Sequence, residues 1–174
     1  MATSMFVKFC RKRKGIIEGE CTDNGHEKWC VITSLSQTFN NKTLPPPTIP
    51  KKAPVAKTCE PDAISIKKIV DKASGELMRM CWYCEQLEEV VIECFRASPG
   101  QSGETQPIKY FSIELKDVTI KEFEFEVDEG DLVTEDLDLV AERAVYTYTE
   151  MNKERGTAIP FGSATIITGS ANGG

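Results

Sequence analysis

The chain has 174 residues, 40% of them hydrophobic, and a formal net charge of -6. That size and composition suit one globular domain with a substantial core. The acidic balance argues against a general nucleic-acid binder, which needs excess Lys and Arg to neutralise phosphates. No stretch approaches the ~20 apolar residues of a membrane-spanning helix. The basic run Arg11–Lys14 follows a short apolar stretch, the reverse of a secretory signal. We therefore expect a chain made in the cytoplasm, with no nucleic-acid partner and no membrane insertion.

The seven cysteines are an odd number. Without a signal peptide they are expected to stay reduced, and a buried free cysteine behaves as a small hydrophobic residue. The pair Cys81-x-x-Cys84 raises two other options, half a zinc site and a redox pair. A structural zinc site needs four ligands, yet there is no second such pair and His26 is the one histidine. A thioredoxin-like pair needs a βαβ setting that the sequence does not show. We expect no metal and no cofactor.

The first half of the chain is predicted to hold two strands. Residues 5–10 are a predicted strand with Met5, Val7 and Phe9 on one face, and Asn24-Gly25 is a strong turn signal. Residues 27–39 form a longer candidate strand. Its predicted inward face holds Trp29, Val31, Thr33 and Leu35.

Residues 40–61 are predicted to be an extended loop. Five prolines fall between Leu44 and Pro54, three of them consecutive. Proline fixes φ and removes a backbone donor, so no central strand can run here. A loop of this length without structure of its own is uncommon in a compact domain. We expect it to be either disordered or ordered by a partner.

The segment from Ile64 to Ala97 organises the prediction, because it contains the one convincing helix. Ser74 is the predicted N-cap, and Glu76 places negative charge at the positive end of the helix dipole. Apolar segments flank the helix on both sides. Its predicted apolar face holds Leu77, Cys81 and Cys84.

The second half of the chain is predicted to form further strands. Residues 109–115 alternate well, but the apolar parity changes at Lys121-Glu122, which predicts a bulge or bend. Residues 128–131 are a predicted turn, and two more strands are expected around 137–139 and 144–148. The tail, 156–174, offers one short pairing segment. The alternating glutamates Glu122, Glu124 and Glu126 are expected to be a solvated strand face rather than a calcium site.

These elements predict a mainly β fold: a small β-barrel or sandwich of about seven to nine strands with one flanking α-helix, in a single domain spanning 1–174. No catalytic residues are predicted, because the sequence shows no serine or cysteine nucleophile motif that His26 could serve as a general base. An alternative function is a monomeric β-barrel binding module, with a metal held by cysteines.

Three blocks of sequence resemble the haemolysin-coregulated protein (Hcp) family, the inner-tube protein of type VI secretion systems. The first runs from Met5 through Gly15-Ile16-Ile17-Glu18-Gly19-Glu20 to Gly25-His26. The second contains the step Asp71-Lys72-Ala73-Ser74 into the helix. The third holds Leu115-Lys116-Asp117-Val118 and Tyr146-Thr147-Tyr148. The chain departs from the family pattern in its Pro-rich loop and in Cys21, where Ser is usual.

The resemblance implies a structural role without catalysis. It implies hexameric rings that stack into a tube inside a contractile sheath, with a spike at the tip and effectors in the lumen. It also implies assembly in the cytoplasm and secretion without a signal peptide. Loop 40–61 is the candidate for contact between stacked rings. The residues predicted to make that contact are Thr43, Leu44, Pro45, Pro46, Pro47, Ile49, Lys51 and Lys52.

Overall fold

The computed structural model describes residues 3–41, 59–99, 105–127, 129–151 and 158–167. This part of the chain holds ten strands and one helix. The elements are β1 (Thr3–Arg11), β2 (Gly15–Ile17), β3 (Cys30–Ser36), β4 (Phe39–Asn41), β5 (Cys59–Pro61), β6 (Ile64–Ile69), α1 (Ser74–Trp82), β7 (Gln86–Pro99), β8 (Thr105–Glu126), β9 (Thr134–Met151) and β10 (Ala158–Ile167).

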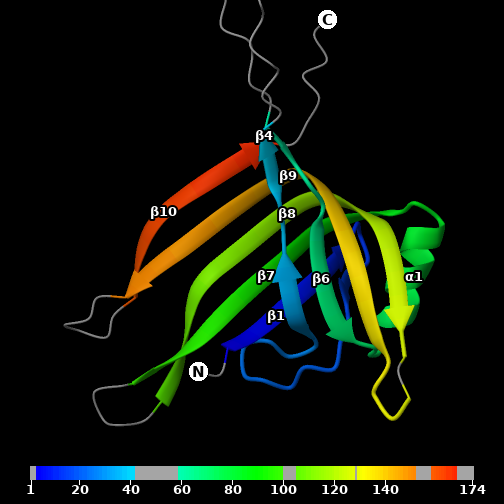
Figure 1. The fold of residues 1–174 in the computed structure, drawn as a ribbon, viewed down its shortest axis with the longest axis horizontal. Coiled ribbons are helices and arrows are strands. Elements are labelled where there is room, and N and C mark those ends of the chain that lie inside the picture. The colour runs from blue at the N-terminus through cyan, green and yellow to red at the C-terminus, as the bar shows by residue number, and fades with distance from the viewer. Residues whose placement is uncertain (1–2, 42–58, 100–104, 128, 152–157, 168–174) are drawn as a thin grey trace, which may run out of the picture.

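Six of the strands close into an antiparallel barrel. Their order is β9-β6-β3-β1-β7-β8, and the pairing of β8 with β9 completes the ring. β2 adds to β1, and β10 pairs with the second part of β9 (Arg143–Met151), beyond the part that pairs with β6. On the left of Figure 1, β7, β8, β9 and β10 run side by side as a sheet that extends beyond the barrel. The predicted β-barrel with one flanking helix is confirmed. The described residues hold ten strands rather than about seven to nine, because the short strands β2, β4 and β5 had no pattern of their own.

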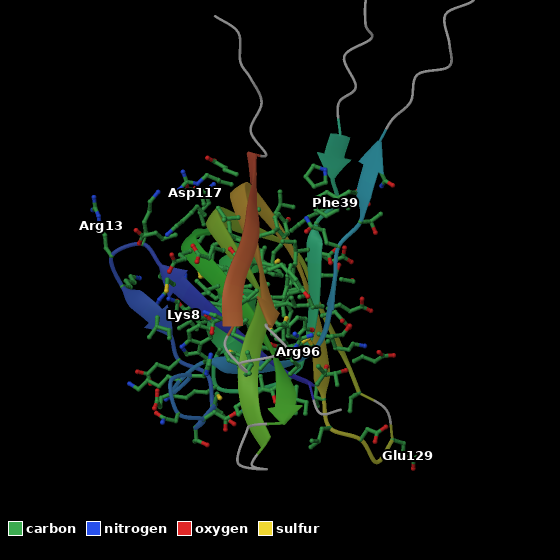
Figure 2. The ribbon with its side chains drawn as sticks, turned by 90° about the vertical axis from the view of Figure 1, so that its left-hand side faces the viewer. Lys8, Arg13, Phe39, Arg96, Asp117 and Glu129 are labelled. Carbon is green, nitrogen blue, oxygen red and sulfur yellow. The ribbon has the colours of Figure 1, made fainter. Side chains whose placement is uncertain are left out.

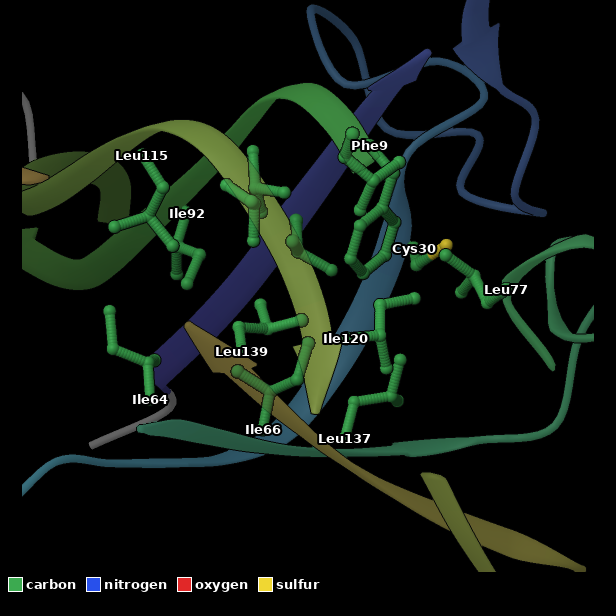
Figure 3. Close-up of a cluster of buried hydrophobic side chains, with 14 of the residues drawn as sticks. Phe9, Cys30, Ile64, Ile66, Leu77, Ile92, Leu115, Ile120, Leu137 and Leu139 are labelled. Carbon is green, nitrogen blue, oxygen red and sulfur yellow. The ribbon is translucent and has the colours of Figure 1, made fainter. Parts of the chain in front are cut away.

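The barrel interior is filled mainly by aliphatic side chains, together with one phenylalanine, two cysteines and a methionine. Figure 3 shows these side chains converging from strands far apart in the sequence, together with Leu77 from α1. Phe9, Leu115 and Leu137 are completely buried. Burying each such side chain contributes about 1.5–3 kcal/mol relative to leaving it in water, so this cluster is the main stabilising feature of the fold.

Strand β3 corrects one prediction. Its buried side chains are Cys30 and Ile32, whereas Val31 is 50% exposed. The predicted inward face is therefore wrong at its start. The register of β3 against β6 shifts between Ile32 and Ser34, and this irregularity turns Leu35 back toward the core. A bulge of this kind cannot be recognised from a simple alternation.

The helix begins differently from the prediction. Ala73, not Ser74, occupies the N-cap position, and it makes no side-chain capping bond. Ser74 is the first helical residue, and its Oγ accepts a hydrogen bond from the backbone N–H of Asp71 (2.9 Å). The buried face holds Ser74, Leu77 and Met80. Cys84 is exposed because the helix ends at Trp82, two residues before it.

Strands β8 and β9 confirm the predicted parity change. Their register shifts between Ile120 and Glu122, so Ile120 is buried and Phe123 still packs against the core. The two predicted strands at 137–139 and 144–148 are one continuous strand, β9. The tail contributes β10, as predicted. The ends of the predicted loop 40–61 pair with each other as part of β4 and β5.

Candidate assembly surfaces

Lys68, on β6, lies at the centre of a buried polar network. Its side chain is 0% exposed, and its Nζ lies 2.6 Å from Oε1 of Glu135 and 2.7 Å from Oδ1 of Asp71. It also donates to Ser74 Oγ (3.2 Å). Glu135 is 1% exposed, and neither of its carboxylate oxygens accepts a well-aligned hydrogen bond from the described residues. The network therefore fastens β6, the start of α1 and β9 together by charge.

His26 belongs to an aromatic and ionic cluster rather than to a reactive site. Its ring stacks on Phe6 with centroids 4.4 Å apart. Its Nε2 lies 2.8 Å from Oε2 of Glu93, and Lys109 donates to the other oxygen of the same carboxylate, also at 2.8 Å. Burial raises the pKa of Glu93, but the hydrogen bonds from Lys109 and His26 outweigh it and hold the pKa below its usual value. The cluster attaches the loop before β3 to β1 and β7.

Arg79 links the middle of α1 to the segment that follows the helix. Its guanidinium donates to both oxygens of Glu76 and to both oxygens of Glu85, at 2.6–3.0 Å. Arg11 adds a bond to Glu76 at 2.7 Å. The Arg79 guanidinium is the main reason why the pKa of Glu76 falls from 4.5 to about 2, and it also lowers the pKa of Glu85.

A basic tip, defined as Arg11–Lys14, joins β1 to β2. Arg13 has φ 62, a left-handed conformation that turns the chain sharply. Lys12 and Arg13 are exposed, and Lys12 Nζ lies only loosely, at 3.8 Å, from Asp117. A recess of about 240 Å³ opens beside the tip. It is lined by Arg11, Lys12, Lys14, Met80, Glu85 and Gln86.

An acidic tip, defined as residues 122–133 without the undescribed residue 128, forms the hairpin between β8 and β9. Glu126, Glu129 and Asp131 are exposed there. Phe125 (62%) and Leu132 (69%) are exposed apolar side chains beside them. Figure 2 places Arg13 and Glu129 on opposite sides of the molecule. One copy of the chain thus presents opposite charges in opposite directions.

Strand β10 leaves a free sheet edge. Within the described residues it pairs only with β9. An unpaired edge offers a row of backbone N–H and C=O groups to another strand. This edge lies at the border of the sheet that extends beyond the barrel (Figure 1).

The described residues contain no group of three or more His, Cys, Asp or Glu side chains placed to hold a metal ion. Cys81 and Cys84 are both free thiols. The helix α1 has nine residues, and nothing in the described ranges is a helix long and apolar enough to cross a bilayer.

The residues predicted to contact a stacked ring, from Thr43 to Lys52, lie outside the described residues. Sequence reasoning also missed Lys68 and Glu135, because a charged residue in a strand is normally exposed. The one signal was position: both alternate with buried apolar residues, Lys68 after Ile64 and Ile66 and Glu135 before Leu137 and Leu139.

The described residues thus form a closed antiparallel barrel with a flanking helix and an added edge strand. The family described as "Type VI secretion system effector, Hcp" matches residues 6–153. The chain belongs to this family, whose members are structural tube proteins of the type VI secretion system and not enzymes.

Solved structures of low sequence identity share the fold. A type six secretion system protein superposes with a TM-score of 0.78 at 15% identity, over 95% of this chain and 96% of that one. Hcp1 from E. coli EAEC 042 gives 0.70 at 13% identity, over 95% and 99%. The secreted protein Hcp3 from Pseudomonas aeruginosa gives 0.62 at 19% identity, over 97% and 100%. No curated protein matches the chain.

Proposed function

We propose that this chain is the subunit of a hexameric ring and that such rings stack into the inner tube of a type VI secretion system. The family match over residues 6–153 is the observation that carries the proposal. In the full assembly the tube lies inside a contractile sheath under a spike protein, and effectors travel in its lumen. The subunit is assembled in the cytoplasm and leaves the cell through the system itself.

The two charged tips suit a contact between neighbours in the ring. A ring requires a heterologous interface, in which one surface of a subunit meets a different surface of the next. The basic tip and the acidic tip are complementary in charge and lie on opposite sides of the subunit (Figure 2). Complementary charges guide two surfaces into register and suppress wrong pairings. The exposed Phe125 and Leu132 add apolar area to the acidic side.

The edge of β10 supports the same assembly. A subunit that kept this edge free in solution would be prone to uncontrolled edge-to-edge pairing. A closed ring removes the hazard, because each subunit covers the edge of its neighbour. We therefore assign β10 to the ring contact together with the two tips.

The first test is the mass of the purified chain in solution, measured by light scattering on a sizing column under reducing conditions, with electron micrographs of the peak. We expect a mass near six subunits and ring-shaped particles. A monomer without rings would overturn the assembly proposal and favour the monomeric binding module.

A charge reversal tests the assigned contact. Arg13→Glu should dissociate the ring, because it places like charges opposite each other, and Glu129→Arg in the same chain should restore it. Glu142→Lys, at an exposed position on β9, is the matched control and should leave the ring intact. An Arg13→Glu variant that still runs as a hexamer would remove the charged tips from the interface.

Stacking is assigned to the loop residues Thr43–Lys52 and is tested separately. Deletion of Pro45–Pro54 should leave single rings and abolish tubes in electron micrographs. Prolines lower the entropy that is lost when such a loop becomes ordered against a neighbour. Tubes of normal length from the deletion variant would contradict this assignment.

A further inference from the structure

The end of α1 carries two thiols in an unusual backbone arrangement. The N–H of Glu85 donates to the carbonyl oxygen of Met80 (2.9 Å), and the N–H of Cys84 donates to that of Cys81 (3.2 Å). This pair of bonds is the Schellman motif, which ends many helices. Its left-handed position is usually glycine, but here Cys84 occupies it with φ 53.

The conformation of Cys84 carries a cost that glycine would avoid. The left-handed region brings Cβ too close to the following carbonyl oxygen, so a residue with a side chain is disfavoured there relative to glycine. Strained backbone conformations cluster at functional sites, so this one calls for an explanation other than stability. At this position the residue supplies an exposed thiol, because Cys84 is the one exposed cysteine among the six whose side chains are described.

The turn brings the two cysteines within reach of each other. The hydrogen bond from Cys84 N–H to the Cys81 carbonyl closes a four-residue turn, and such turns hold their first and last Cα atoms less than about 7 Å apart. A disulfide needs a Cα separation of about 4.4–6.8 Å. The charge of Cys84 also raises the pKa of Cys81, after the larger effect of burial, as expected for two thiols that lie close together.

We propose that Cys81 and Cys84 form a reversible intrachain disulfide that locks the end of α1. A low-molecular-weight disulfide such as oxidised glutathione serves as the oxidant. The thiolate of Cys84 attacks one sulfur of the oxidant and releases one thiolate, which leaves a mixed disulfide on Cys84. The thiolate of Cys81 then attacks Sγ of Cys84 and releases the second thiolate. The two thiol protons pass to the two released thiolates, so the oxidant is reduced to two thiols.

The surroundings favour the disulfide over the dithiol. A strongly oxidising pair is one whose thiolate is stabilised, as happens at a helix N-terminus. This pair sits at the C-terminal, negative end of α1, and Glu122 lies close enough to raise the pKa of Cys81 further. A thiolate is therefore disfavoured at Cys81, and this favours the disulfide over the dithiol.

The redox state of Cys81 and Cys84 would differ between compartments. Reducing conditions in the cytoplasm keep the pair as thiols, and release from the cell exposes it to oxidising conditions. This compartment step rests on the proposed secretion, whereas formation of the disulfide does not. The turn between the cysteines carries Trp82 and Tyr83, which are 83% and 65% exposed. The disulfide would fix this aromatic pair on the outside of the helix.

The test uses the purified full chain in glutathione buffers from fully reduced to fully oxidised. After acid quenching, denaturation and alkylation, trypsin and a glutamate-specific protease release the peptide Met80–Glu85, which contains both cysteines and not Cys94. We expect oxidised samples to contain this peptide without alkyl groups and two hydrogens lighter. Cys94 should be alkylated in every sample, because it is buried until denaturation.

Two variants control the assignment. Cys84→Gly keeps the left-handed residue in the form that the motif prefers, so it should fold and lose the mass change completely. Cys94→Ala should retain the change. A lasting glutathione adduct on Cys84 with Cys81 free, or a link between Cys84 residues of two chains, would overturn the proposal. Neither result bears on ring formation, which the solution mass under reducing conditions reports separately.

Discussion

Lys68 and Glu135 form an ion pair that is sealed from solvent, with Nζ and Oε1 2.6 Å apart and side chains 0% and 1% exposed. The two residues face each other directly in the ladder between β6 and β9. Removing two charges from water costs several kcal/mol per ion, and their mutual attraction has to offset that cost. The pair thus fixes which residues meet at the β6–β9 seam more than it adds net stability.

We predict that Lys68→Met destabilises the chain by about 3–5 kcal/mol, because it leaves the Glu135 carboxylate buried without a counter-charge. The measurement is urea unfolding followed by circular dichroism. The double variant Lys68→Met, Glu135→Leu should recover most of the loss, since it removes the buried Glu135 carboxylate. Asp71 also loses Lys68, but it keeps the hydrogen bond from the backbone N–H of Ala73 and is partly exposed. If the double variant were as unstable as the single one, packing rather than charge would account for the effect.

Glu76 should make the free energy of unfolding depend on pH in the acid range. Its pKa lies at about 2 in the folded chain and near 4.5 otherwise, mainly because Arg79 donates to its carboxylate. A lowered folded pKa stabilises the fold above the unfolded value, and that contribution disappears as the pH falls from about 4.5 to about 2.

Glu76→Gln should therefore cost about 1 kcal/mol at pH 7, as an accessible ion pair does, and less below pH 3. Thermal melts between pH 7 and pH 2.5 measure this difference. Glu142→Gln, on the exposed side of β9, is the control. A constant gap between Glu76→Gln and the wild type at every pH would contradict the prediction.

Two glycines should respond to alanine in opposite directions. A Cβ on Gly19 would lie 2.4 Å from the carbonyl oxygen of Trp29, which is backbone and cannot yield easily. We expect Gly19→Ala to destabilise by about 1–3 kcal/mol. Gly75 lies in the first turn of α1 with open space around it, so Gly75→Ala should stabilise by about 0.5 kcal/mol. Chemical unfolding of both variants in one buffer checks the two signs.

His26 should prove structural in a substitution series. His26→Ala removes the stack on Phe6 and one of the two partners of the Glu93 carboxylate. We expect a loss of about 2 kcal/mol, and about half as much for His26→Gln, which keeps a hydrogen-bond donor near Glu93. Urea unfolding midpoints give both values. An unchanged midpoint for His26→Ala would show that the cluster adds nothing to stability.

The sequence predicted the strands and the helix because their apolar periodicity is strong. β1, β8 and the central part of β7 read directly from alternating residues, and even the parity change at Lys121-Glu122 marks a true register shift. The closure of the barrel could not be read in the same way. It depends on which strand pairs with which, and the pairing of β6 with β9 leaves no local signal in either strand.

Features that depend on one irregular residue could not be predicted from the sequence either. The inward face of β3 was misassigned because the shift between Ile32 and Ser34 leaves no mark in the alternation. The cap of α1 was misassigned because Ser74 bonds backward to Asp71 from within the helix, instead of capping it. The charged tips were visible as a basic run and an acidic strand, but only the folded chain shows that they point in opposite directions (Figure 2).

The position of β9 as the last strand of the closed barrel has a consequence for synthesis. β6 ends at Ile69, and its partner β9 does not begin until Thr134. At about 5–20 residues per second, a ribosome needs roughly 3 to 13 seconds to make the chain between them. During that interval the edge of β6 awaits β9, and the edge of β8 awaits the same strand once β8 has been made up to Glu126. The nascent chain is therefore most vulnerable to aggregation just before β9 is complete, and any truncation upstream of Thr134 leaves the barrel open.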